Sequence, residues 1–377
     1  MSHCIITSIF DIKILYPGLN RWRSAERYIK LFEYVVSLDV PTVLFIEPHL
    51  RDRIKHKKNL YVIEYSLVDL PSYKKIKDIS DLISVGNGPH VNKEFTAVIN
   101  DKFYLLSHGK KFLEDLNLHF DHFIWMDSGI AHLGTIPKEK FRDSIDKLLF
   151  KDKIVVYLMK AVDPNEIKNL EEHLKYSRGK IAATLSIFPC DTIDWYFSEY
   201  TKLFDYAISE LKLMCFEEQL MGVLIGMYPN KFEYMYGDYV GLLKNMIHIE
   251  TNMRTVISNL IFCREKGIND IGYKIVLKFI DTIEGTKNYI DFNDFFELCY
   301  NAQIICYYTN KKLSIYFGKL LGFLYYNTLQ GNKIIKDRYN NIFNNLKYVD
   351  INLADEDEFT ERKIIEFDTY NLLWSIM

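Results

Sequence analysis

Short hydrophobic runs alternate with helical patterns over the first part of the chain. The run HCIITSIFDI (3–12) is β-branched and aromatic and ends in an acid, which is typical of a buried strand opening on a loop. SAERYIKLFEYVVSL (24–38) follows, with hydrophobic residues spaced three to four apart, and predicts a helix with Ser24 as its N-cap. VPTVLFIEP (40–48) is a second hydrophobic run, bounded by prolines. This strand, helix, strand order builds parallel sheets.

The pattern continues and then changes after about residue 250. Further strands are predicted over 61–67, 122–127, 152–162 and 179–188, and helices over 101–116, 190–212 and 216–229. Beyond them only helical patterns follow, such as TVISNLIFCREKG (255–267). We therefore expect an α/β catalytic domain over 1–250, with a mainly parallel mixed sheet flanked by helices, and a helical region over 251–377.

Composition and charge narrow the class of protein. The net charge of −3 provides no positive field for a nucleic-acid backbone, so no nucleic-acid partner is expected. Asp11 and Lys13 interrupt the first hydrophobic run before a signal segment forms, and no stretch approaches the ~18 apolar residues that cross a bilayer. The six cysteines are scattered and read as reduced thiols, so a cytoplasmic protein is expected.

One acidic residue stands out at the end of the central hydrophobic run, FIWMDSGIAH (123–132). Asp127 is followed by Ser128 and Gly129, and all three residue types favour turns, so Asp127 as the start of a turn is one reading. The other reading is a binding residue, because ligands of open α/β sheets bind beyond the carboxyl ends of the strands. Asp11, after the first run, is expected on the same edge of the sheet.

Four stretches in this order resemble the bacterial HtrL/YibB family of glycosyltransferase-like proteins, which is related to the GT-A nucleotide-sugar fold. They are ITSIFDI, RWRSAERYIKLFEYVVSLDVPTVLFIEP, FIWMDSGIAH and EEQLMGVLIGMYPNKFEYMYGDYVGLLKN, and together they span about residues 3–250. The resemblance implies a GT-A-like domain that takes a nucleotide-sugar donor.

The resemblance also implies a metal site with Mn²⁺ or Mg²⁺. It places Asp127 where GT-A enzymes hold a divalent cation against the donor diphosphate, since a hard cation prefers carboxylate oxygen. The usual motif supplies a second acid two residues later, and here that residue is Gly129. His248 is the implied late histidine ligand and His132 the competing one, while a purely structural histidine is the alternative for both.

Several residues are implied for the donor. Hydroxyl and carboxylate groups after the first strand would meet the nucleoside, and basic groups would pair with phosphate. Ordinary explanations stay open: a turn at the strand end for Asp11, a solvated helix start for the arginines, and a surface position for the lysines. Lys111 is an alternative to Lys110 for the phosphate contact. The donor residues implied are Thr7, Ser8, Asp11, Arg27, Lys110 and Asp127.

The acceptor side is assigned to carboxylates later in the chain. Glu217 and Glu218 open an otherwise apolar helix, and a buried carboxyl there would have a raised pKa and would suit a general base. The alternative is that both acids only complement the helix dipole. Asp238 lies in YGDY (236–239), a composition that suits a sugar platform or an ordinary turn.

The sequence thus predicts an enzyme that moves a sugar, with metal assistance, from a nucleoside diphosphate sugar to a hydroxyl of a glycan or protein. A UDP-sugar is the first expectation for the donor. The alternative is a catalytically silent relative that binds a sugar or a protein, suggested by Gly129. The tyrosine-rich helical region would shape acceptor choice or oligomer assembly, unless its aromatic residues simply fill a core.

Overall fold

The computed structural model describes residues 2–12, 24–85, 92–176, 179–237, 239–246, 253–283 and 292–328. The chain divides into two compact units, Met1–Met246 and Ile247–Met377. Two residues predicted for the site, Asp238 and His248, lie outside the described residues.

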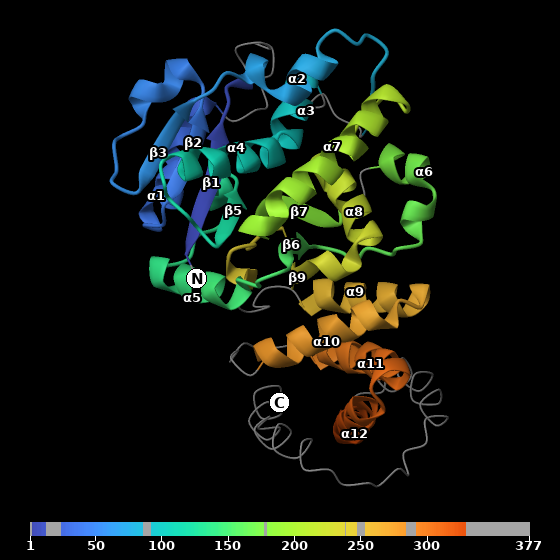
Figure 1. Ribbon diagram of the computed structural model, residues 1–377. Coiled ribbons are helices and arrows are strands. Elements are labelled where there is room, and N and C mark those ends of the chain that lie inside the picture. Colours follow the sequence, from blue (N-terminus) through green and yellow to red (C-terminus); the bar gives the residue numbers. More distant parts are fainter. Residues whose placement is uncertain are drawn as a thin grey trace. The chain divides into compact units, whose positions relative to one another are not determined.

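The first unit is built on a seven-stranded sheet in the order β3-β2-β1-β5-β7-β6-β9 (Figure 1). β7 runs antiparallel to both of its neighbours, and the other four strand pairs are parallel. The fold class predicted from the sequence, a mainly parallel mixed sheet flanked by helices, is therefore confirmed. The strands are β1 (His3–Ile9), β2 (Thr42–Ile46), β3 (Leu60–Glu64), β5 (His122–Met126), β6 (Ile154–Leu158), β7 (Ile181–Pro189) and β9 (Phe232–Tyr236). A separate short pair consists of β4 (Ile83–Ser84) and β8 (Leu213–Met214).

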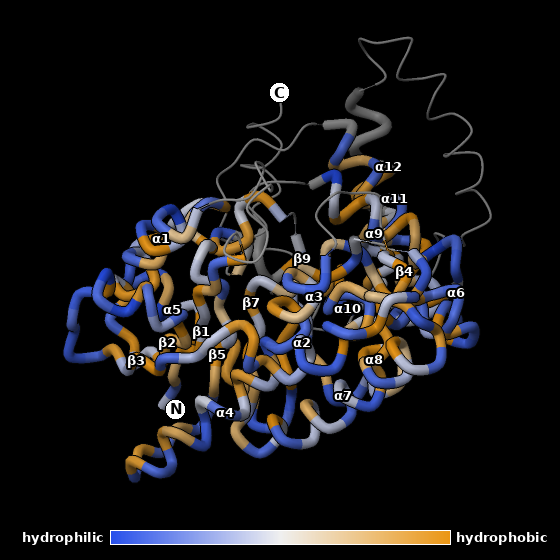
Figure 2. Tube along the Cα trace, turned by 90° about the horizontal axis from the view of Figure 1, so that it is seen from above, coloured by the Kyte–Doolittle hydropathy of each residue, from blue (hydrophilic) through white to orange (hydrophobic). Residues whose placement is uncertain are grey.

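Helices cover both faces of this sheet. Figure 2 shows α1 and α5 on one side of strands β1, β2 and β5, and α4 and α7 on the other. Ser24 caps α1 by accepting a hydrogen bond from the backbone N–H of Arg27, as the sequence predicts. The helices of this unit are α1 (Ala25–Ser37), α2 (Pro71–Ile76), α3 (Lys93–Asn100), α4 (Lys102–Asp115), α5 (Lys138–Leu148), α6 (Leu170–Lys175), α7 (Ile193–Ser209) and α8 (Glu217–Met227).

The helix α4 is fixed tightly on the sheet, which matters because its first residue belongs to the candidate site. A Cβ atom at Gly109 would lie only 2.9 Å from Ile6 Cδ1 on β1, so the missing side chain lets the helix approach the strand. Phe103 packs between the rings of Tyr196 and Tyr200 on α7, at centroid distances of 4.8 and 4.6 Å. Buried aromatic packing of this kind contributes about 1.5–3 kcal/mol per side chain.

The second unit is helical over its described ranges, as predicted for the C-terminal region. Its helices are α9 (Met253–Lys266), α10 (Asn269–Ile283), α11 (Phe292–Thr309) and α12 (Lys311–Thr328). α11 packs against the other three, and Gly272 lets α10 approach α9 and α11, because a Cβ there would lie 3.0 Å from Cys263 Cβ and 2.8 Å from Ile305 Cδ1. No helix within the described ranges has the length and hydropathy needed to cross a membrane.

Candidate functional site

The strand order of the sheet reverses between β1 and β5. β2 and β3 extend the sheet on one side of β1, and β5, which comes later in the chain, adds on the other. Open α/β sheets bind ligands beyond the carboxyl ends of their strands at such a switch point. Ser128 Oγ, just after β5, donates to the carbonyl oxygen of Ser8 on β1 over 2.8 Å, so the two strand ends are joined. The predicted residues Asp11 and Asp127 each follow one of these neighbouring strands.

Asp127 is held in place by groups on both sides of its own strand. Its backbone N–H donates to the Thr184 carbonyl on β7 over 2.9 Å. Trp125 Nε1 donates to Asp127 Oδ1 over 2.8 Å, and Lys102 Nζ lies 3.1 Å from the same oxygen. The second oxygen, Oδ2, lies 3.4 Å from Lys102 Nζ, and the Asp127 side chain remains 33% exposed, so it is partly accessible to a ligand.

Lys102, the first residue of α4, is the centre of the cluster and was not singled out from the sequence. It is only 6% exposed. Its Nζ donates to Glu217 Oε1 over 2.8 Å and to the Ala183 carbonyl over 3.3 Å, besides its contact with Asp127. Burial alone would lower the pKa of Lys102, but the charges of Asp127 and Glu217 outweigh burial and raise it. Lys102 is therefore a permanent buried cation.

Glu217 and Glu218 begin α8 but occupy different surroundings. Glu217 is 6% exposed and bonded to Lys102. Burial raises its pKa, although the neighbouring ammonium opposes this. Glu218 is half-buried and accepts the backbone N–H of Ala183 over 3.4 Å. Burial, reinforced by the charge of Glu217, raises the pKa of Glu218 to about 8. Two adjacent carboxyls thus have different partners and different access.

The start of α8 is set by Gln219 rather than by either acid. Gln219 Oε1 accepts the backbone N–H of Phe216 over 2.8 Å, and its Nε2 donates to the Leu174 carbonyl over 2.8 Å. This side chain fixes the entry of the helix, so both glutamates are left for other contacts. A helix N-terminus also favours carboxylates through its dipole.

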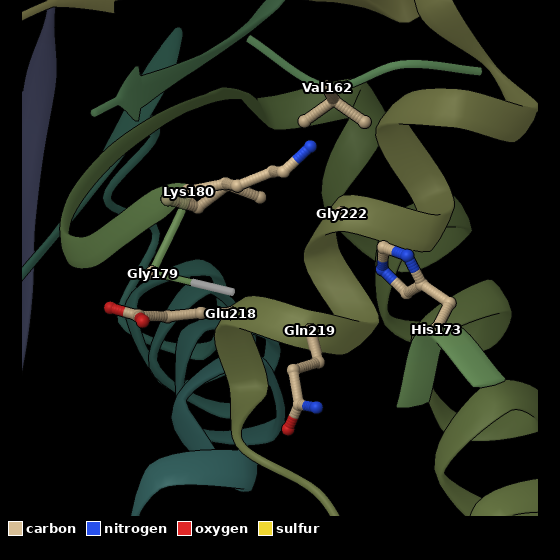
Figure 3. A pocket seen from close by; sticks show the side chains of 8 residues that line it. Val162, His173, Gly179, Lys180, Glu218, Gln219 and Gly222 are labelled. Atoms are coloured by element: carbon tan, nitrogen blue, oxygen red, sulfur yellow. The ribbon is translucent and has the colours of Figure 1, made fainter. Parts of the chain in front are cut away.

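A small cavity borders Glu218 on the side of α6 and β7. Its lining includes Glu218, Gln219, His173 and Lys180, and its volume of about 10 Å³ fits roughly one water molecule. Figure 3 shows the Glu218 carboxyl pointing away from the His173 ring, while Gln219 leaves the helix in another direction. A sugar ring is larger than this enclosed space.

The other predicted residues are spread over β1, the segment after it, α1 and α4. Asp11 Oδ2 lies 3.9 Å from His49 Nε2, and Thr7 is fully buried in β1, where its Oγ1 has no hydrogen-bond partner among the described residues. Arg27 is exposed at the start of α1. Lys110 Nζ lies 2.8 Å from Asp194 Oδ2, a residue of α7, and the donor role of Lys110 stays a prediction.

Two further residues, His132 and Glu47, follow the carboxyl ends of β5 and β2. His132 Nδ1 makes a short contact with the Gly129 carbonyl. Glu47, directly after β2, is buried and accepts the Leu67 N–H over 2.9 Å, and burial raises its pKa. Sequence reasoning missed Glu47, although its signal was available: the run VLFIE ends in an acid, as do the runs before Asp11 and Asp127.

The described residues do not by themselves make the predicted metal site. Within the described ranges, no group of three or more His, Cys, Asp or Glu side chains is arranged to hold a metal ion. Asp127 Oδ1 is already taken by Trp125 and Lys102. One carboxylate edge beside a buried ammonium is a poor ligand set for a divalent cation.

The similarity of this chain to known proteins is distant. No family model matches it, and no curated protein matches it. Among solved structures, one match is the crystal structure of 4-diphosphocytidyl-2C-methyl-D-erythritol synthase from Anaerococcus prevotii DSM 20548. That match has 15% identity and a TM-score of 0.30, and it covers 69% of this chain and 96% of the other. A likeness this distant transfers no function, so the chain is classed by its own sheet as an α/β protein with a Rossmann-like arrangement.

Proposed function

We propose that this protein is a glycosyltransferase that moves a sugar from a nucleoside diphosphate sugar, a UDP-sugar first, to an acceptor hydroxyl. The observation that carries the proposal is the placement of Asp11 and Asp127 at the switch point of the sheet, beside the paired acids Glu217 and Glu218. A switch point suits a nucleotide, and carboxylates close to it suit proton transfer from a hydroxyl.

In this proposal Glu218 is the general base. It takes the proton of the acceptor hydroxyl while the acceptor oxygen forms a bond to the anomeric carbon of the donor sugar. The bond from that carbon to the diphosphate oxygen breaks, and the nucleoside diphosphate leaves. A raised pKa of about 8 lies close to the working pH, which favours efficient proton transfer.

The donor contacts rest on the resemblance to the GT-A fold and on the edge described above. Asp11 and Ser8 would meet the nucleoside, and Asp127 would anchor the donor near the transferred sugar. Thr7 is fully buried, so its side chain would not reach the donor. A requirement for Mn²⁺ or Mg²⁺, with Asp127 and His248 as ligands, stays a prediction, because the described residues do not complete such a site.

A second candidate function has its own support. The Lys102 ammonium already engages Asp127 and Glu217, and Gly129 stands where a second acid is expected. This arrangement also fits a protein that binds a sugar nucleotide or a partner without turning it over.

A donor screen tests the proposal. Melting temperatures are measured with UDP-, GDP- and CMP-sugars, with and without Mn²⁺, and each stabilising donor is then followed for hydrolysis. The glycosyltransferase proposal expects one donor class to raise the melting temperature and to be hydrolysed slowly. Stabilisation without hydrolysis or transfer favours the silent relative. No stabilisation by any nucleotide sugar rejects both the glycosyltransferase and a silent relative that binds such a nucleotide.

A further inference from the structure

Lys102 differs from the other basic residues of the protein. In the part of the chain that the structure describes, it is the one lysine or arginine that is buried. Burying an ammonium is costly unless opposite charges and hydrogen bonds compensate it. Here the compensation comes from segments far apart in the sequence, since Lys102 precedes Glu217 by 115 residues and Asp127 by 25.

All three N–H groups of the Lys102 ammonium have acceptors within the protein. A lysine has three N–H groups. The Lys102 Nζ has three acceptors within 3.5 Å, which are Glu217 at 2.8 Å, Asp127 at 3.1 Å and the Ala183 carbonyl at 3.3 Å. No N–H group remains for a substrate phosphate, so Lys102 acts through the side chains it holds.

The two glutamates at the start of α8 differ in how accessible their carboxyls are. The carboxyl of Glu217 is enclosed and bound to Lys102, so an acceptor hydroxyl has no access to it. Glu218 is half-buried, and its hydrogen bond to the Ala183 N–H is long, at 3.4 Å. Figure 3 shows its carboxyl extending away from the helix.

We propose, on the basis of the glycosyltransferase function above, that Lys102 is a positioning residue. Its ammonium fixes Asp127 and Glu217 in their places, Glu217 acts as its buried counter-ion, and Glu218 is the carboxyl that meets the acceptor.

A set of substitutions at this ion pair tests the proposal. Lys102→Met leaves Glu217 and Asp127 without their cation, so it should lower the melting temperature by several degrees. The double variant Lys102→Met with Glu217→Gln removes the stranded charge and should recover at least half of that loss. Lys75→Met is the matched control, because Lys75 pairs with Asp205 on the surface, where an ion pair contributes little.

Turnover with the best donor separates positioning from stability alone. The double variant should remain at least about tenfold below wild type in kcat, with a smaller change in donor KM, since Asp127 has lost its orienting cation. The acidic limb of its pH profile should move to lower pH, because the double variant loses the charge of Glu217, which raises the pKa of Glu218, together with the weaker opposing charge of Lys102.

Two results would overturn the assignment. One is a double variant less stable than Lys102→Met, which would mean that Glu217 is not the counter-ion. The other is a folded double variant with wild-type kcat and KM, which would remove Lys102 from the working site. The stability comparison needs no substrate, so it stands even if every donor fails and the glycosyltransferase proposal falls.

Discussion

The two compact units bury different kinds of polar side chain. The buried charged residues described in the first unit are Glu47, Asp101, Lys102, Asp163 and Glu217. In the described ranges of the second unit, the buried polar side chains are the neutral Asn259, Asn301, Gln303 and Ser314. Burying an uncharged amide that finds a hydrogen bond costs far less than burying a charge.

The partners of these groups differ as well. Asn259 and Asn301 donate to backbone carbonyls four residues earlier in their own helices, over 2.9 and 2.7 Å. In the first unit, Asp101 accepts from Ser72 on another helix, and Lys102 joins α4 to α8. Asn259 and Asn301 thus serve their own helices, whereas Asp101 and Lys102 tie separate segments together. Buried charges that join separate segments often gather at functional sites, which is consistent with the proposal that the site lies in the first unit.

The largest effect is expected from Glu218→Gln. Loss of a general base typically lowers turnover by about 10²–10⁴-fold, and the donor affinity should stay close to that of wild type because Glu218 serves the acceptor. Glu217→Gln should lower turnover by less than about tenfold, since Glu217 is only the counter-ion of Lys102. Steady-state kinetics with the best donor measures both. Equal losses of turnover in the two variants would contradict the assignment of different roles to Glu217 and Glu218.

The pH dependence of stability gives the second prediction. Burial raises the pKa of Glu218 to about 8 in the folded protein. The Glu218 carboxyl therefore keeps a proton in the folded protein that it releases above about pH 4.3 in the unfolded chain. The stability from this protonated carboxyl is present at low pH and is lost as the pH rises toward 8. Relative to wild type, Glu218→Gln should therefore gain stability with rising pH, on the order of a few kcal/mol.

Urea unfolding of the two proteins between about pH 5 and pH 9 measures this difference. Glu139→Gln is the control, because Glu139 is an exposed acid on α5. A constant difference between Glu218→Gln and wild type across this range would show that burial does not perturb Glu218.

A packing change in the second unit should have a smaller effect. Gly272→Ala introduces a Cβ atom 3.0 Å from Cys263 Cβ, which lies close to the helix backbone and cannot swing away. Overpacking typically costs about 1–3 kcal/mol, partly offset here by the better helix propensity of alanine. Thermal unfolding should show the loss, and donor affinity should not change. Weaker donor binding in this variant would connect the helical unit to the donor site.

The smallest change is expected when the second unit is removed. A chain that ends at residue 250 keeps every described residue of the candidate site and the predicted ligand His248, so its donor affinity should match that of the full protein within about twofold. Calorimetric titration on the folded, shortened chain measures this affinity. A loss of donor binding would mean that the helical unit supplies a donor contact, and the assignment of donor binding to the first unit alone would be wrong.

Much of the fold could be predicted from local patterns. The hydrophobic runs that became β1, β2 and β5 are buried strands because their residues are β-branched or aromatic, and Ser24 signals the start of α1. The direction of β7 was not predictable, since a buried strand reads the same in both directions. α5 was missed because its sequence, KEKFRDSIDKL, contains few hydrophobic residues.

The candidate site was only partly accessible from the sequence. Asp127, Glu217 and Glu218 were found because an acid at the end of a hydrophobic run is a local signal. Lys102 gives no such signal, since a lysine in the first turn of a helix is usually a solvated residue. Its burial results from the packing of Phe103 against α7 and from two carboxylates much later in the chain. Tertiary contacts of this kind are set by the whole fold.

Donor binding by Asp127→Asn tests the central claim most directly. Calorimetric titration of the best nucleotide sugar is carried out on wild type, on Asp127→Asn and on Asp143→Asn, in which an exposed aspartate of α5 is changed in the same way. The account predicts at least about tenfold weaker donor binding for Asp127→Asn, equal to ~1.4 kcal/mol, and an unchanged affinity for the control. Wild-type affinity in a folded Asp127→Asn protein would contradict the account, because the donor would then bind somewhere other than the carboxyl end of β5.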